Sequence, residues 1–132
     1  MRVNFELLPV VVREESLGIL EFESLPFVPV RVYWLHNLNF GAIRGFHAHK
    51  TLRQFMWAIS GTVIIKLQDG KESVNVQIES NATGLLLEPG LWRELHSFSQ
   101  DAVILVAASQ AFDESDYIRN WDQYLKWTAD AR

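Results

Sequence analysis

The sequence contains no cysteine, which excludes disulfide bonds, a thiolate nucleophile and a sulfur-ligated metal. Long hydrophobic runs are also missing. The apolar stretch at residues 102–108 is far shorter than the roughly 18 residues that a membrane-spanning helix needs. The N-terminus lacks a basic stretch followed by an apolar one, so no export signal is expected. These absences predict a cytoplasmic protein with no membrane association.

Positive charge is not in excess either. Twelve Lys and Arg residues stand against 16 Asp and Glu residues, and the formal net charge is −4 at pH 7. Because nucleic-acid surfaces usually carry a basic excess, we expect no nucleic-acid partner. An anionic small ligand would have to meet locally clustered arginines.

The composition is sufficient for one globular core. The chain has 132 residues, of which 48% are hydrophobic and 21% are charged. It contains no internal repeat, low-complexity linker or change in composition. Residues 1–132 are therefore predicted to form a single domain.

Short segments rich in β-branched and aromatic residues, separated by turn signals, predict an all-β sandwich or barrel. Ser60-Gly61 and Asp69-Gly70 are expected to close hairpins, which would make the strands on either side antiparallel neighbours. Apolar residues spaced by three and four between residues 114 and 127 predict a short amphipathic C-terminal helix, capped by Ser115 and packed outside the sheet. The clearest strands are expected at residues 30–35, 55–59, 62–67, 74–78 and 103–107.

Residues 41–61 carry the most specific pattern. Two glycines frame His47, His49 and Gln54 at a spacing that resembles the first cupin motif, with Gln54 where a glutamate ligand usually stands. His47 and His49 lie two apart on an expected strand, so both imidazoles would point to the same face, into the mouth of a barrel. Two nitrogen bases would then share one pocket.

Such a histidine pair can hold a metal, transfer protons or pack in a core. The adjacent Arg44 and Lys50 make the setting polar and cationic, which favours a functional role. A metal would need a third and usually a fourth ligand, but Gln54 is a poor ligand, Arg93 stands where a histidine would be expected, and only His96 is left. We expect no metal and no other cofactor. Histidines with a pKa near neutrality suit proton transfer at a carbon next to a carbonyl, which indicates an isomerase or epimerase.

Over nearly its whole length the chain resembles the dTDP-4-keto-6-deoxyglucose 3,4-ketoisomerases of deoxysugar biosynthesis. The most specific part is the stretch RGFHAHK at residues 44–50, followed by Gln54. Further matches lie before and after it: Gly18, Glu21, Pro26-Phe27, Arg31-Val32-Tyr33, Gly61, Asp69-Gly70, Gly84, Pro89, Trp92, Glu94, Phe98 and Asp116-Tyr117-Ile118-Arg119.

The resemblance implies a metal-free cupin jelly roll, an antiparallel all-β fold, in a homodimer that exchanges N-terminal strands. The apolar run at residues 7–12 fits such a strand, although it fits an ordinary inner strand equally well. The implied substrate is a dTDP-linked 4-keto-6-deoxyhexose. Removal of its C3 proton would give an enediol, and reprotonation at C4 would leave the ketone at C3, as on routes to 3-amino sugars of lipopolysaccharides, S-layer glycans or antibiotics.

By the same resemblance, His47 and His49 are catalytic, and the sequence does not say which is the base. Arg44 would stabilise the enediolate or bind the diphosphate. Strand alternation puts Arg44 opposite the histidines, so Gly45 must permit a local bend. Arginines outside the signature fit a solvated surface about as well as a substrate site. The residues assigned to substrate binding are Arg31, Tyr33, Lys50, Gln54, Trp92, Glu94, His96 and Arg119.

Leu17 and Arg93 depart from the family's pattern and, with His96, are expected to line the sugar pocket. They would influence the face on which C4 is reprotonated, giving a 3-keto-6-deoxyglucose or a 3-keto-6-deoxygalactose product. Two other functions stay open. A dTDP-sugar 3,5-epimerase would also remove the C5 proton, and a non-catalytic sugar-binding cupin module would bind without turnover. The double-histidine signature and the short chain favour the ketoisomerase.

Overall fold

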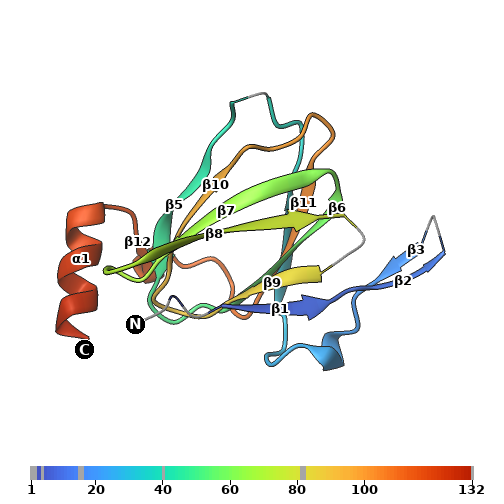
Figure 1. The fold of residues 1–132 in the computed structure, drawn as a ribbon. Coiled ribbons are helices and arrows are strands. Elements are labelled where there is room, and N and C mark those ends of the chain that lie inside the picture. Colours follow the sequence, from blue (N-terminus) through green and yellow to red (C-terminus); the bar gives the residue numbers. More distant parts are fainter. Residues whose placement is uncertain (1–2, 4, 15–16, 40, 81–82, 132) are drawn as a thin grey trace.

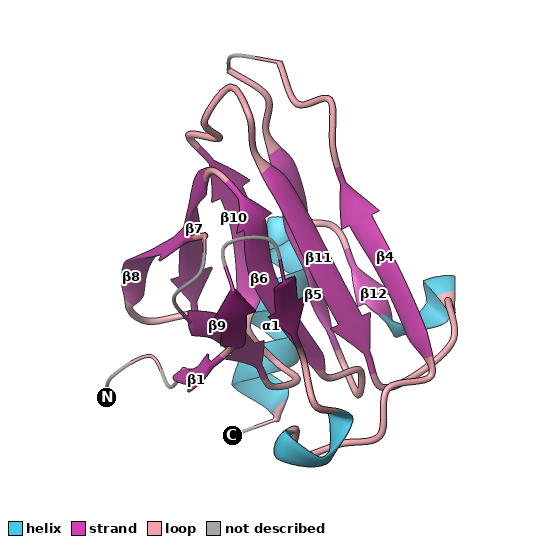
Figure 2. Cartoon of the chain, turned by 90° about the vertical axis from the view of Figure 1, so that its right-hand side faces the viewer, coloured by secondary structure: helices cyan, strands magenta, loops and turns pink. Residues whose placement is uncertain are grey.

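The computed structural model describes residues 3, 5–14, 17–39, 41–80 and 83–131, which form two antiparallel sheets packed face to face (Figures 1 and 2). The first sheet has the order β1 (Glu6–Pro9), β9 (Thr83–Leu87), β6 (Gln54–Ser60), β11 (Val103–Ala108) and β4 (Arg31–Leu35). The second has the order β12 (Tyr117–Ile118), β5 (Arg44–His49), β10 (Trp92–His96), β7 (Thr62–Gln68) and β8 (Ser73–Glu79). A hairpin of β2 (Val11–Glu14) and β3 (Leu17–Ile19) projects from this body, and a 3-10 turn η1 (Phe22–Ser24) follows it (Figure 1).

The five strands expected from the sequence are all present, and each end lies within one residue of its predicted position. In β8 the expected alternation holds, because Val76 and Ile78 are buried whereas Asn75 and Gln77 are exposed. The prediction of an all-β sandwich is therefore confirmed.

One of the two predicted hairpins is wrong. Asp69-Gly70 does join the antiparallel neighbours β7 and β8. Ser60-Gly61, however, carries the chain from one sheet to the other, since β6 pairs with β9 and β11 whereas β7 pairs with β8 and β10. A short glycine-containing link looks the same in sequence whether it closes a hairpin or turns a corner between sheets.

The C-terminal helix begins later than predicted. Helix α1 covers Trp121–Asp130, and its first turn is capped by Asn120, whose side chain accepts from the Gln123 N–H at 2.9 Å. Glu114–Asp116 instead form a 3-10 turn, η2, in which Ser115 donates to the capping residue Asp113. The next two residues are held extended as β12 by pairing with β5. As predicted, the helix packs outside a sheet, through the aromatic cluster Trp92, Trp121 and Tyr124.

The hydrophobic core fills the space between the sheets. Its largest cluster contains the inward-facing residues of β7 and β9 together with β11 residues such as Ile104 and Val106, all of them buried. Toward β4, β5 and β12 polar side chains replace the apolar ones and surround a cavity. Within the part of the chain that the structure describes, the single α-helix is too short and too polar to cross a membrane.

Candidate active site

A cavity of about 360 Å³ lies between the sheets, and strands of both sheets contribute to its wall. Its polar and charged lining residues are Tyr33, Arg44, His47, Arg93, Tyr117 and Arg119. The apolar remainder includes Leu35, Met56, Leu95 and Val106, so the cavity lining combines apolar side chains with several basic ones. Such a mixture suits a small anionic ligand with a ring.

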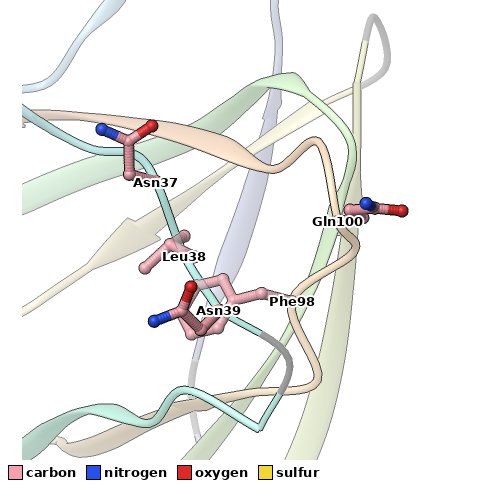
Figure 3. Close-up of a pocket in the computed structure, with 5 residues that line it drawn as sticks. All are labelled: Asn37, Leu38, Asn39, Phe98 and Gln100. Atoms are coloured by element: carbon pink, nitrogen blue, oxygen red, sulfur yellow. The ribbon is translucent and has the colours of Figure 1, made fainter.

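A second hollow, of about 450 Å³, lies at the loops that follow β4 and β10 (Figure 3). It is lined by Asn37, Leu38, Asn39, Phe98 and Gln100. None of these side chains titrates near neutral pH, and in Figure 3 the Gln100 side chain points away from the two asparagines. Acid–base chemistry therefore belongs to the first cavity.

A bulge in β5 brings Arg44 and His47 to the same cavity. Gly45 and Phe46 both have left-handed backbone conformations, with φ of +89° and +58°, and the register against β10 shifts at this point. The extra residue reverses the normal alternation of side chains. The bend that the sequence required at Gly45 is thus present, and Arg44 lies on the same side as His47.

The hydrogen bond of His47 fixes its tautomer. Its Nδ1 lies 3.0 Å from the backbone oxygen of Gly45. Because a carbonyl oxygen can only accept, Nδ1 must carry the proton, which leaves Nε2 with a free lone pair. His47 is therefore positioned to take up a proton at Nε2.

His49 has the same tautomer for a different reason. Its Nδ1 lies 3.1 Å from Oδ2 of Asp116. This oxygen also accepts from the Leu52 N–H, and the other carboxylate oxygen, Oδ1, accepts from the backbone N–H and the hydroxyl of Thr51. Burial alone would raise the pKa of Asp116, but these hydrogen bonds lower it below its ordinary value, so the group is a carboxylate and His49 donates to it. The Nε2 of His49 is buried and has no partner among the described residues. The rings of His47 and His49 are perpendicular, with centroids 4.9 Å apart.

Both histidines are neutral at cellular pH. Burial, assisted by the charge of Arg93, lowers the pKa of His47 to about 3. The same two causes lower the pKa of His49 to about 4, although Asp116 opposes them. The sequence led us to expect values near neutrality. The difference arises because the chain buries the imidazoles themselves, next to a buried arginine, and the result is two bases that are unprotonated above about pH 5.

We expect these depressed pKa values to make stability depend on pH. Between about pH 4 and 6.5 the unfolded chain binds more protons at His47 and His49 than the folded chain, so stability rises with pH in this range. At pH 5 each histidine should reduce the unfolding free energy by roughly 1–2 kcal/mol relative to pH 7. We expect urea unfolding at pH 5, 6 and 7 to show that the unfolding free energy rises less steeply with pH in the His47→Asn/His49→Asn double variant than in the wild type. An equal rise in both proteins would contradict the lowered pKa values of the two histidines.

Arg93 is held at the cavity by its neighbours. It is 1% exposed, and its guanidinium donates to Gln54 Oε1 at 2.5 Å and to the Leu91 carbonyl. Burial lowers its pKa to about 10, so it is still a cation at pH 7. The Gln54 amide in turn donates to the Tyr33 hydroxyl at 3.0 Å. Gln54 thus orients both the Arg93 cation and the Tyr33 phenol toward the cavity. In a metal-binding cupin the residue at the position of Gln54 would instead be a metal ligand.

Sequence comparison places the chain among known enzymes. The family described as "FdtA: WxcM-like, C-terminal" matches residues 5–129. The chain belongs to the FdtA family. It is 38% identical over 117 residues to a TDP-4-oxo-6-deoxy-alpha-D-glucose-3,4-oxoisomerase from Aneurinibacillus thermoaerophilus. The aligned residues cover 89% of this chain and 84% of the relative.

Solved structures of FdtA-family relatives have the same fold as this chain. QdtA, a sugar 3,4-ketoisomerase from Thermoanaerobacterium thermosaccharolyticum solved in complex with TDP, superimposes with a TM-score of 0.92 at 32% identity, over 99% of this chain and 98% of QdtA. A QdtA variant in complex with TDP-4-keto-6-deoxyglucose gives a TM-score of 0.91 at 31% identity, over 98% and 97% of the two chains. The predicted family and cupin fold are confirmed.

Four of the eleven residues predicted for this FdtA-family site line the cavity. Arg44, Tyr33 and Arg119 line it, together with His47. Arg31 lies just beyond, with its guanidinium carbon 5.2 Å from the Tyr33 ring centre. The Nε and Nη2 atoms of Arg31 are buried without a hydrogen-bond partner among the described residues, which leaves them available to an anion.

Three predicted substrate-binding residues lie elsewhere. Trp92, Glu94 and His96 alternate with Arg93 along β10, and therefore point to the outer face of the sheet when Arg93 points inward. Trp92 packs against Trp121 of the helix, and Glu94 accepts hydrogen bonds from Trp92 and His96 at 3.0 Å each. The structure does not bring these three side chains to the cavity.

Two further predictions differ from the structure in the same way. The Lys50 side chain is exposed in the turn after β5 and does not line the cavity. Leu17 is exposed on the projecting β2–β3 hairpin, so within this chain it is not part of the pocket. Arg93, which was expected at the pocket with Leu17, does line it.

Sequence reasoning missed the roles of Asp116 and Tyr117. Both were recognised as matches to the family, but the helical spacing of the tail assigned Tyr117 to a helix face. In the structure the Tyr117 ring lies 4.9 Å from His47 and 4.3 Å from His49, between centroids. Pairing of β12 with β5 sets the register Tyr117 to His49. An acidic residue next to a tyrosine, in a stretch that matches the family, is the signal that would have identified them.

Proposed function

We propose that the protein converts TDP-4-keto-6-deoxyglucose to a TDP-3-keto-6-deoxyhexose. The observation that carries this proposal is the pair of neutral imidazoles with free Nε2 atoms, His47 and His49, beside one cavity. Isomerisation of a ketone needs a base that is unprotonated at neutral pH and a second group that moves protons between oxygens. The bound TDP and TDP-4-keto-6-deoxyglucose in QdtA support the choice of substrate.

His47 is the base in this proposal because it lines the cavity directly. The C4 carbonyl acidifies the C3 proton, which His47 Nε2 removes as the C3–H bond breaks. The electron pair forms the C3=C4 bond, and the negative charge develops on the C4 oxygen. His47 Nε2 then returns a proton to C4, which restores the neutral base and breaks the double bond. The C3 hydroxyl loses its proton in the same step, and the C3 oxygen becomes the new ketone.

His49 transfers the remaining proton. Its ring lies 4.9 Å from that of His47 between centroids, and Asp116 accepts its Nδ1 proton, so only Nε2 can exchange protons. The C3 hydroxyl must lose its proton and the C4 oxygen must gain one. The imidazole of His49 can accept the proton from the C3 hydroxyl and donate a proton to the C4 oxygen. The adjacent carboxylate of Asp116 stabilises the imidazolium that forms between the two transfers.

The enediolate charge faces two donors. Tyr33 accepts from Gln54, which leaves its own O–H free to donate, and burial keeps its pKa above the ordinary value, although Arg93 opposes this. Arg93 supplies a buried positive charge, which interacts strongly because water is excluded. Arg44, Arg31 and Arg119 are left for the diphosphate, whose oxygens match the planar fork of a guanidinium.

Chemical trapping of the product tests the proposal. The protein is incubated with TDP-4-keto-6-deoxyglucose, the mixture is reduced with sodium borodeuteride, and the position of deuterium in the sugar is read by NMR. We expect deuterium at C3, and the coupling of the C4 proton gives the C4 configuration. Deuterium only at C4, as in a control without protein, would contradict the proposal.

We expect Asp116→Asn to lower kcat about ten- to a hundredfold with little change in KM. The amide cannot hold the Nδ1 proton of His49 as a carboxylate does, and the imidazolium loses its counter-charge. Steady-state kinetics against Asp122→Asn, an exposed position in the first turn of α1, provide the comparison. A change in KM alone would show that Asp116 has no part in proton transfer.

We also propose a homodimer that exchanges N-terminal strands. β4 is the outer strand of its sheet and, among the described residues, pairs only with β11. Its outward side chains Val32 and Trp34 are 42% and 57% exposed, and the β2–β3 hairpin projects from the same molecule (Figure 1). Large exposed apolar groups on a sheet edge are typical of subunit interfaces. Light scattering should give twice the 15.2 kDa of one chain, and a stable monomer would contradict this proposal.

A further inference from the structure

Of the four arginines at the site, one is already paired with a carboxylate. Arg119 donates through Nε to Glu114 Oε1 at 2.7 Å and through Nη2 to Glu114 Oε2 at 3.0 Å. Among the described residues, no such ion pair is formed by the other three: Arg31, Arg44 and Arg93. Arg119 is thus the cation whose charge at the cavity is offset by a neighbouring side chain.

The pair lies close to the proposed catalytic groups. The Arg119 guanidinium stacks 4.1 Å from the centre of the Tyr117 ring, and that ring contacts both His47 and His49. In a nucleotide sugar the diphosphate is attached to C1, which is only two bonds from C3. A sugar with its C3 at His47 therefore has its diphosphate within reach of Arg119.

We propose that Glu114 competes with the diphosphate of the substrate for Arg119 and so sets the affinity of the site. This inference rests on the proposed function. A carboxylate and a phosphate occupy the same two-pronged fork of a guanidinium, so they cannot both hold its Nε and Nη2 edge. If the diphosphate uses the other edge, Glu114 still repels it as a like charge at short range.

Exchange of one anion for the other is feasible because the pair is open to water. Arg119 is 51% exposed and Glu114 is 59% exposed, and ion pairs of this kind hold together weakly. Glu114 sits in the short turn η2, whose backbone is fixed by the cap at Asp113 and by the buried neighbour Asp116. The carboxylate of Glu114 therefore stays near the cavity after it releases Arg119, and the ion pair can form again when the product leaves.

Calorimetric titration with TDP alone tests this inference, because it needs no turnover. We expect Glu114→Gln to bind TDP about three- to tenfold more tightly than the wild type at roughly 50 mM salt, with a smaller gain at roughly 200 mM because the repulsion is screened. The control is Glu79→Gln, which makes the same change in net charge at an exposed position of β8. It should bind TDP as the wild type does.

A double variant shows whether the effect passes through Arg119. In the background of Arg119→Gln, the added Glu114→Gln change should give a clearly smaller gain than in the wild type. Unchanged or weaker TDP binding by Glu114→Gln overturns the inference, and so does an equal gain in the double variant. Failure of the wild type to bind TDP at all would instead count against the proposed function.

Discussion

Replacement of His47 by asparagine is expected to lower turnover of TDP-4-keto-6-deoxyglucose by at least about a hundredfold, the usual scale for a general acid–base group. Asparagine can keep the hydrogen bond to the Gly45 carbonyl but has no basic nitrogen. His49→Asn is expected to have an effect of the same order, because the proton could no longer pass between the two sugar oxygens. Both variants should stay folded, since asparagine is smaller and neutral.

The two histidine variants should differ in partial reactions. His47→Asn should fail to exchange the C3 proton, whereas His49→Asn should still exchange it slowly while forming little product. His36→Asn, at an exposed position just after β4, is the control and should retain wild-type turnover. Near-normal turnover in both site variants would refute the proposed mechanism.

Substitution of Gly45 by alanine, which adds a single methyl group, is expected to lower turnover at least about tenfold. The residue has φ of +89°, and an added Cβ would lie 2.8 Å from the backbone oxygen of Arg93 and 3.3 Å from a Leu95 methyl. A backbone atom cannot move away as a side chain can, so β5 must shift from β10 and the bulge that aims Arg44 and His47 is lost. We expect Gly45→Ala to reduce the unfolding free energy by about 1–3 kcal/mol.

The variant Gly41→Ala separates the effect of backbone strain from the effect of the clash with β10. Gly41 has a similar φ of +82°, but an added Cβ would meet nothing within 4 Å. This control should lose some stability from the backbone strain and keep its turnover. Urea unfolding and steady-state kinetics on both variants provide the measurement. Equal turnover in Gly45→Ala and the wild type would mean that the bulge does not position the site.

The part of the site that the sequence could predict depends on local geometry. His47 and His49 lie two apart, and Gly45 between Arg44 and the histidines required a bend, which the structure contains. Spacing within one strand is fixed by covalent geometry, so it can be read without knowing which strands are neighbours. The same alternation, applied to β10, would have placed Trp92 and Glu94 on the face opposite Arg93.

The part that could not be predicted depends on contacts between distant segments. Asp116 reaches His49 only because β12 pairs with β5, and helical spacing in the tail concealed that strand. The pKa values of the histidines were also beyond the sequence, because they result from burial beside Arg93. Desolvation is a property of the packed chain and has no local signature.

Proton NMR in deuterated water tests the central claim most directly. The protein is mixed with freshly generated TDP-4-keto-6-deoxyglucose, a sample without protein serves as control, and the C3, C4 and C5 signals are followed over time. We predict loss of the C3 proton, growth of a 3-keto species that carries deuterium at C4, and full retention of the C5 proton. Exchange at C5 with the ketone still at C4, or a spectrum that never changes although the ligand binds, would contradict the account.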